Sequence, residues 1–251
     1  MKIALISDIH SNVYALDAVI KDIERRGVDV CANLGDILYG PIAPKQTFEL
    51  LMQHDFVTIS GNQDRQIYES TQDEIASNPT MQFILDDLEK DAITWLKSLP
   101  FDKQLTEDVY LCHGSPQSDL IYFLENVESG RPRIREDKDI VYLSGGQNSK
   151  VICCGHTHIP RAIYLSTKQW IVNPGSVGLQ AYTDDLPYKH AMENFNPFAS
   201  YALIEKNDNA AWFIEHIRVP YDIDRAAAEC AARKRSDWAH YITTGRIPSD
   251  F

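Results

Sequence analysis

Polar residues of a restricted kind follow five apolar, strand-like runs of this 251-residue chain. In chain order they are Asp8 and His10, Asp36 after Gly35, Asn62 after Gly61, His113 before Gly114, and His156 and His158 after Gly155. Residues two apart in an extended segment point to the same side, and the adjacent glycines allow turns that a side chain would obstruct. Because ligands of open α/β sheets bind beyond the carboxyl ends of strands, we expect these side chains to converge.

Two carboxylates, four imidazoles and one amide oxygen are about what two divalent cations require if one carboxylate bridges them. Paired metal ions roughly 3.5 to 4 Å apart stabilise the attacking and leaving oxygens of a displacement at phosphorus. Nitrogen and oxygen ligation without thiolate suits manganese, iron, zinc or nickel better than calcium. The sequence does not choose among these metals, and we expect manganese to support activity in vitro.

Each of these short motifs, taken alone, could have a purely structural role. Asp-x-His and Gly-Asp are more often turns or helix caps, because Gly and Asp favour turns. Five such elements in order, each directly after a strand, agree with one another in a way that turn formation does not explain. The histidines outside the pattern are expected at the surface or in local hydrogen bonds: His54, His190, His216 and His240.

The motifs SDIHSN, LGD, GNQD, CHGSP, GHTHIP and NPGSVG together resemble the calcineurin-like metallophosphoesterase superfamily. They are most similar to its small bacterial and archaeal phosphodiesterase branch, which includes relatives described as diadenosine tetraphosphatases. The resemblance covers roughly residues 1–220. It implies an α/β fold, a four-layer αββα sandwich of two mixed sheets flanked by helices. We expect a single domain over 1–251, with a core over about 1–220 and a C-terminal helical extension over about 221–251.

The resemblance also implies roles for the seven residues. One metal ion would be bound by Asp8, His10 and His158, the other by Asn62, His113 and His156, with Asp36 bridging them. Asp36, Asn62 and His113 would also act in catalysis, with a metal-bridging hydroxide as nucleophile. Coordination makes such a hydroxide available at neutral pH, because it lowers the pKa of water from about 15.7 to roughly 7. We therefore expect a metal-dependent hydrolase of phosphodiesters or phosphoanhydrides.

Gln63 departs from the pattern of the superfamily, in which many members carry a histidine that stabilises or protonates the leaving group. A carboxamide can donate a hydrogen bond but cannot transfer a proton near pH 7. We therefore expect leaving groups that depart as stable anions, as in anhydrides, aryl esters and dinucleoside polyphosphates. Gln63 is a candidate substrate contact, and Asp64 is expected to orient its neighbours.

Arg65 and Arg161 follow two of the ligand motifs closely enough to bind a substrate phosphate, which arginine recognises through paired hydrogen bonds. Ion pairs with acidic neighbours are the alternative for both residues. Tyr182 has two alternatives, stacking on a nucleobase or packing. The run Asn173 to Ser176 has turn chemistry and is expected to shape the cavity wall.

The formal charge of −12 disfavours non-specific binding of nucleic acid or anionic membranes, which requires clustered Lys and Arg. The expected partner is a small phosphorylated substrate, nucleotides included. The sequence leaves open whether the protein forms a homo-oligomer. A metal-dependent nuclease is the weaker enzymatic alternative, beside a phosphomonoesterase or protein phosphatase. The non-enzymatic alternative is a scaffold or regulatory protein built on the phosphoesterase fold.

The opening MKIALISDIH is interrupted by Asp8 too soon for a signal peptide. No apolar run approaches the roughly 20 residues that span a bilayer, so we expect a cytoplasmic protein. The five cysteines have no CxxC spacing. Four of them lie in strand-like apolar runs and are expected in the core, namely Cys31, Cys112, Cys153 and Cys154, and the fifth is Cys230.

The elements that must position these residues alternate at first between strand and helix. Strands are predicted at 2–7, 28–34, 56–60, 109–112, 151–154, 162–166, 169–172, 201–205 and 211–219. Helices are predicted at 13–26, capped by Ser11 or Asn12, at 45–54, within 63–100, and over 223–241 as one or two helices packed at the edge. We expect a surface excursion at 128–138 and a long loop at 181–197.

Overall fold

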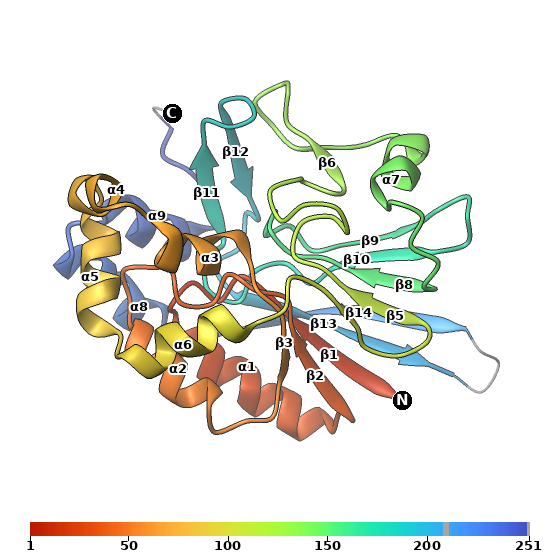
Figure 1. Ribbon diagram of the computed structural model, residues 1–251, viewed down its shortest axis with the longest axis horizontal. Helices are drawn as coiled ribbons and strands as arrows, with labels where there is room; N and C mark the ends of the chain where they lie inside the picture. Colours follow the sequence, from red (N-terminus) through yellow and green to blue (C-terminus); the bar gives the residue numbers. More distant parts are fainter. Residues whose placement is uncertain (208–210, 250–251) are drawn as a thin grey trace.

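Two mixed five-stranded sheets form the centre of the computed structural model, which describes residues 1–207 and 211–249 (Figure 1). The first sheet has the order β14 (Trp212–Val219), β13 (Ala199–Lys206), β1 (Lys2–Ile6), β2 (Val30–Asn33), β3 (Val57–Thr58). The second has the order β4 (Lys103–Gln104), β5 (Val109–Leu111), β8 (Val151–Cys153), β10 (Trp170–Asn173), β9 (Arg161–Tyr164). The parallel strands are β1, β2 and β3 in one sheet and β5, β8 and β10 in the other.

Alternation along β1 explains why it lies at the centre of the fold. Ile3 and Leu5 point into the layer between the two sheets, where they meet Val109 and Val151 of the second sheet. Ala4 and Ile6 point to the opposite face, which helices cover. A strand buried on both faces is continuously apolar, as this run of sequence is.

Helices cover the outer faces of both sheets and complete the four layers that the resemblance implies. The first sheet is covered by α1 (Val13–Arg26), α2 (Pro44–Leu51), α5 (Pro79–Asp87), α6 (Lys90–Ser98), α8 (Ile223–Ala232) and α9 (Ser236–Thr244). The remaining helices are α3 (Asn62–Glu69), α4 (Gln72–Ser77) and α7 (Asp137–Leu143). Ile140 of α7 packs with Ile152 and Ile171 on the outer face of the second sheet.

The predicted boundaries hold most closely for the first helix. α1 spans Val13–Arg26, and the Asn12 side chain accepts a hydrogen bond of 3.2 Å from the Ala15 backbone N–H. Gly27 ends the helix with a φ of 61°, a conformation that glycine adopts without strain. The closing segment forms two helices, and residues 250–251 of the predicted extension lie outside the described part of the chain.

The prediction of a long loop at 181–197 is wrong. β11 (Ala181–Asp184) and β12 (His190–Glu193) pair there as an antiparallel hairpin. The sequence HAME of β12 has no β-branched residue, so strand propensity did not reveal it. The charged excursion predicted at 128–138 also contains a short strand, β7 (Arg133–Ile134), which pairs with β6 (Glu125–Asn126), and the start of α7.

All five cysteines are buried and unpaired, as expected for core residues. Among the described helices, none is both long and apolar enough to cross a bilayer.

Leu5→Ala should destabilise the protein by about 2–5 kcal/mol, because Leu5 is fully buried between the sheets and its removal leaves a cavity. Urea unfolding followed by circular dichroism measures this loss. Leu120→Ala is the control, since Leu120 is 58% exposed and its truncation should change the stability by less than about 0.5 kcal/mol. Equal effects of the two substitutions would contradict the position assigned to Leu5.

Candidate metal centre

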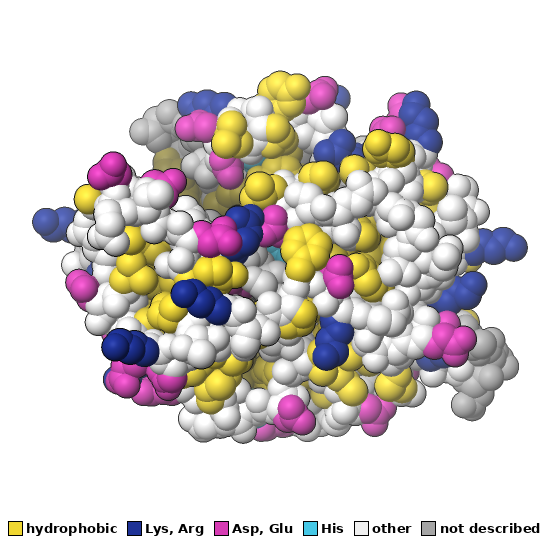
Figure 2. Space-filling view, in the orientation of Figure 1, with side chains coloured by type: hydrophobic (Ala, Val, Ile, Leu, Met, Phe, Trp, Pro, Cys, Tyr) yellow, Lys and Arg dark blue, Asp and Glu magenta, His cyan; other side chains and the backbone are white. Residues whose placement is uncertain are grey.

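The loops that follow β1, β2, β3, β5 and β8 bring the predicted ligands together at one end of the two sheets. Two groups of side chains result: Asp8, His10 and His158 form one, and Asp36, His113 and His156 form the other. Within each group the potential ligand atoms all lie within 4.8 Å of one another. The histidines divide as the resemblance implies, whereas Asp36 lies in the second group alone and its bridging of two ions stays a prediction. On the face seen in Figure 2, histidine is visible only as small areas between other side chains.

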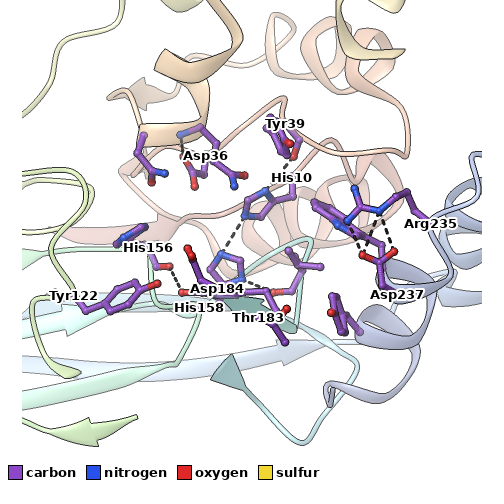
Figure 3. A pocket seen from close by; sticks show the side chains of 16 residues that line it. His10, Asp36, Tyr39, Tyr122, His156, His158, Thr183, Asp184, Arg235 and Asp237 are labelled. Carbon is purple, nitrogen blue, oxygen red and sulfur yellow. Dashed lines mark hydrogen bonds and ion pairs between the residues drawn. The ribbon is translucent and has the colours of Figure 1, made fainter. Parts of the chain in front are cut away.

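In the first group, backbone carbonyls select which ring nitrogen carries the proton. The Nδ1 atom of His10 lies 3.0 Å from the Tyr39 carbonyl oxygen, and that of His158 lies 2.7 Å from the Leu179 carbonyl oxygen. A neutral imidazole that donates from Nδ1 carries its lone pair on Nε2. The two Nε2 atoms lie 3.0 Å apart, as the dashed line between the rings marks in Figure 3. Two lone pairs at that distance repel unless a cation lies between them.

Asp8 adds a carboxylate to the first group. Its Oδ2 atom accepts a hydrogen bond of 3.2 Å from the His156 backbone N–H, whereas its buried Oδ1 atom has no hydrogen bond and lies 3.4 Å from His158 Nε2. A buried carboxylate oxygen without a donor is costly, and a bound cation removes that cost. These donor atoms therefore fit a divalent metal ion.

The second group repeats this arrangement with an amide oxygen added. The Nδ1 atom of His113 lies 2.7 Å from the Leu34 carbonyl oxygen, and its Nε2 atom lies 3.0 Å from the Asn62 side-chain oxygen and 3.5 Å from Asp36 Oδ2. The His156 ring lies beside that of His113, with centroids 5.1 Å apart. Asn62 is the first residue of α3.

The carboxylates make positive charge favourable at His113 even though the residue is buried. Burial opposes a charge there, but the neighbouring Asp36 raises the pKa of His113 to about 10. For His10, burial and the nearby His158 lower the pKa to about 4, so this ring is neutral. A metal ion bound between Asp36 and His113 can supply the positive charge that a proton otherwise supplies.

The backbone is strained at five of the seven predicted ligands. The φ angles of these residues are positive: 55° at Asp8, 48° at His10, 55° at Asp36, 68° at His156 and 60° at His158. A non-glycine residue in the left-handed region costs about 1–3 kcal/mol and persists only where its surroundings determine it. Such strain concentrated in one cluster is typical of a functional site.

Asp64 holds two of the ligand loops together, as predicted for a residue that orients its neighbours. Its carboxylate accepts hydrogen bonds from the backbone N–H groups of Asp36, Ile37 and Gly61, at 2.8, 2.8 and 2.9 Å. Burial and the neighbouring Asp36 raise the pKa of Asp64 to about 7. Gly61 permits the close approach of the two loops, since a Cβ atom there would lie 2.2 Å from Asp36 Oδ1.

The NPGSVG run supports the opposite side of the centre. The Ser176 hydroxyl donates to the Asp8 carbonyl oxygen at 2.8 Å, and the Asn173 side-chain amide donates to the Gly155 carbonyl oxygen at 2.7 Å. The run therefore connects the loops after β1 and β8.

A cavity of about 220 Å³ opens at the metal centre, and the β11–β12 hairpin and α9 form much of its wall. Of these two segments, the sequence connected only Tyr182 with a substrate. The hairpin contributes Thr183 and Asp184, and α9 contributes Asp237 and Trp238 (Figure 3). Tyrosines are frequent in the whole wall: Tyr182 from the hairpin, Tyr241 from α9, and Tyr39 and Tyr122 from other segments. No sequence motif marks these residues. The apolar helical spacing of α9 predicted the helix but not its position at the cavity.

The sequence matches the calcineurin-like phosphoesterase superfamily domain over residues 1–192. The chain belongs to that superfamily. An uncharacterized protein of Methanocaldococcus jannaschii is 28% identical, and the match covers 94% of each chain. The metallophosphoesterase of Sphaerobacter thermophilus is 24% identical with a TM-score of 0.76, and the match covers 98% of this chain and all of that one. This likeness supports the fold of two mixed sheets.

The two arginines predicted to contact substrate lie outside the cavity wall of this superfamily member. Arg65 donates from Nε and Nη2 to Asp119 and from Nη1 to Glu69, at 2.9 to 3.0 Å. Arg161 donates from Nε to the buried Glu125 at 2.6 Å. Both guanidinium groups therefore form the ion pairs that were the alternative, and their contact with substrate stays a prediction.

Gln63 and Tyr182, in contrast, line the cavity. The Gln63 backbone N–H donates to Asp36 Oδ1 at 2.8 Å. The Tyr182 hydroxyl donates to the His156 carbonyl oxygen at 3.1 Å, and its ring packs against His158 with centroids 4.6 Å apart. Packing is thus the observed role of Tyr182. His190, outside the ligand pattern, is buried in local hydrogen bonds with Tyr188 and Tyr122.

Asp64→Ala should lower the free energy of unfolding by about 3 kcal/mol or more, because three buried N–H groups lose their acceptor at about 1–3 kcal/mol each. Urea unfolding of metal-free protein measures the change. Asp55→Ala removes an exposed carboxylate from a neighbouring loop and should change stability by less than about 0.5 kcal/mol. A loss below about 1 kcal/mol for Asp64→Ala would argue against its role in holding the loops.

Proposed function

We propose that this protein is a metal-dependent hydrolase that cleaves phosphodiester or phosphoanhydride bonds at a dinuclear metal centre. The observation that carries the proposal is the pair of buried ligand groups, above all the Nε2 atoms of His10 and His158, which face each other at 3.0 Å while Nδ1 of each ring faces a backbone carbonyl oxygen. Membership of the phosphoesterase superfamily supports the reaction class.

The residues divide into two sets of ligands with Asp36 between them. Asp8, His10 and His158 would hold one ion, Asn62, His113 and His156 the other, and Asp36 both. When bound, the two ions would supply a hydroxide nucleophile at neutral pH and offset the charge that builds on the phosphoryl oxygens. The backbone N–H of Gln63 orients the Asp36 carboxylate, and the Tyr39 and Leu179 carbonyls fix the tautomers of His10 and His158.

Among the described residues that line the cavity, few groups could transfer a proton to the leaving group. The histidines among these described residues are His10, His156 and His158, all of them predicted ligands. Gln63 occupies the position after Asn62, and burial raises the pKa of the Tyr182 hydroxyl well above its usual value. Since general acid catalysis typically contributes about 100- to 10,000-fold, substrates with poor leaving groups should suffer most.

Asp36→Asn should abolish turnover and reduce the bound metal from two ions to one, because a neutral amide cannot bridge two cations. Elemental analysis of the protein after loading with manganese and desalting measures the stoichiometry, and hydrolysis of bis(p-nitrophenyl) phosphate measures turnover. Asp17→Asn is the control, since Asp17 pairs with Lys21 on the exposed face of α1. Activity retained with a single bound ion would contradict the bridging role.

A panel of phosphate substrates assayed with manganese should separate by leaving group. We expect diadenosine tetraphosphate and aryl diesters to turn over at least about 100-fold faster than serine phosphate, because Gln63 cannot supply a proton. Faster hydrolysis of serine phosphate would overturn this specificity. Absence of turnover with manganese, iron, zinc and nickel alike would favour a non-catalytic scaffold.

A further inference from the structure

Arg235, at the N-terminal end of α9, is the one Lys or Arg among the described residues that line the metal-centre cavity. The charged side chains that share this wall, apart from the histidines, are the carboxylates Asp36, Asp184 and Asp237. Figure 3 shows Arg235 and Asp237 at one end of the cavity, with His156 and Tyr122 at the other. The cavity therefore has a cationic group at a distance from its metal ligands.

Neighbours hold the Arg235 guanidinium in a fixed orientation without using all of its donors. Nε and Nη2 donate to the Asp237 carboxylate at 2.9 and 2.6 Å, and Nη1 donates to the Thr80 hydroxyl at 2.6 Å. A guanidinium has five N–H donors, so two remain for a ligand. The Trp238 ring lies 5.2 Å from the guanidinium carbon and 5.7 Å from the His10 ring, so one indole separates Arg235 from the metal centre.

The same arginine borders a second hollow, a groove of about 660 Å³ between α4, α5 and the link from α8 to α9. Two further cations, Arg233 and Lys234, line this groove next to Arg235. Arg233 is engaged by Glu229 and by the Phe83 ring, whereas Lys234 is exposed with a φ of 61°. Of these three cations Arg235 alone lines both hollows, and the groove wall also contains the carboxylate of Glu74. A chain with a formal charge of −12 thus places three consecutive cations along this groove.

We propose that Arg235, with Lys234 beside it, binds a non-scissile phosphoryl group of a polyphosphate chain whose scissile phosphoryl group lies at the metal centre. This inference rests on the proposed function and narrows its substrate class to phosphoanhydrides with two or more phosphoryl groups. The planar fork of arginine recognises phosphate oxygens through paired hydrogen bonds. Asp237 acts as a positioning residue, because it keeps the guanidinium plane at the cavity wall. The rest of the substrate extends into the groove.

The first test compares kcat/KM for diadenosine tetraphosphate with that for bis(p-nitrophenyl) phosphate, which has a single phosphoryl group. Arg235→Ala should lower the ratio of the two values by about 10- to 100-fold, mostly through KM, since a hydrogen bond to a charged group contributes on that order. Arg235→Lys keeps the charge and should restore part of the ratio. Arg225→Ala, on the exposed side of α8 where Arg225 lies over Tyr14, should leave the ratio unchanged.

An equal loss on both substrates in the Ala and Lys variants would overturn the inference and assign Arg235 to fold stability, and an unchanged ratio would overturn it as well. A protein that hydrolyses neither substrate would instead refute the proposed function. Calorimetric binding of inorganic tripolyphosphate needs no turnover and tests Arg235 in that case too. The Kd should rise at least about tenfold in Arg235→Ala, and an unchanged Kd would overturn the inference.

Discussion

Two buried imidazoles direct their Nε2 atoms at each other at 3.0 Å, and the surrounding structure depends on a cation, either a proton or a metal ion, that offsets the repulsion of two lone pairs there. Backbone carbonyls at Tyr39 and Leu179 fix the protons on the far side of each ring, so the rings cannot relieve the conflict by changing tautomer. Buried carboxylates lie close by and need positive charge in the same place. The folded protein therefore brings together buried donor atoms that favour a bound cation.

The scaffold around this centre is built to keep strained loops in place. Five ligands have left-handed backbone conformations, which persist only where neighbouring contacts determine them. Asp64 supplies such contacts on one side by joining the loops after β2 and β3, and Ser176 supplies them on the other by holding the loop after β1. The buried layer between the two sheets fixes the strands from which all of these loops begin.

The candidate metal ligands and the far wall of the cavity come from different parts of the chain. The ligands follow strands of the two sheets and end at His158, whereas the far wall of the cavity comes from the β11–β12 hairpin and from α9. Within this wall, α9 packs against β11. The superfamily match ends at residue 192, so it includes most of the hairpin and excludes α8 and α9, the part of the chain that contributes Asp237 and Trp238 to the wall.

The sequence by itself predicted the first helix, seven candidate ligand positions and the strands of the two five-stranded sheets apart from β4, because each candidate ligand directly follows an apolar run whose period is a local property. It also indicated that Asp64 orients its neighbours. It did not reveal the short strands β4, β6, β7, β11 and β12. Only the tertiary structure decided which partners Arg65 and Arg161 have, that 181–184 and 190–193 pair, and that Arg235 reaches the cavity. Asp119 is 54 residues from Arg65, and α9 is far in sequence from every ligand. Such contacts depend on how the layers pack, and no local pattern of residues encodes that packing.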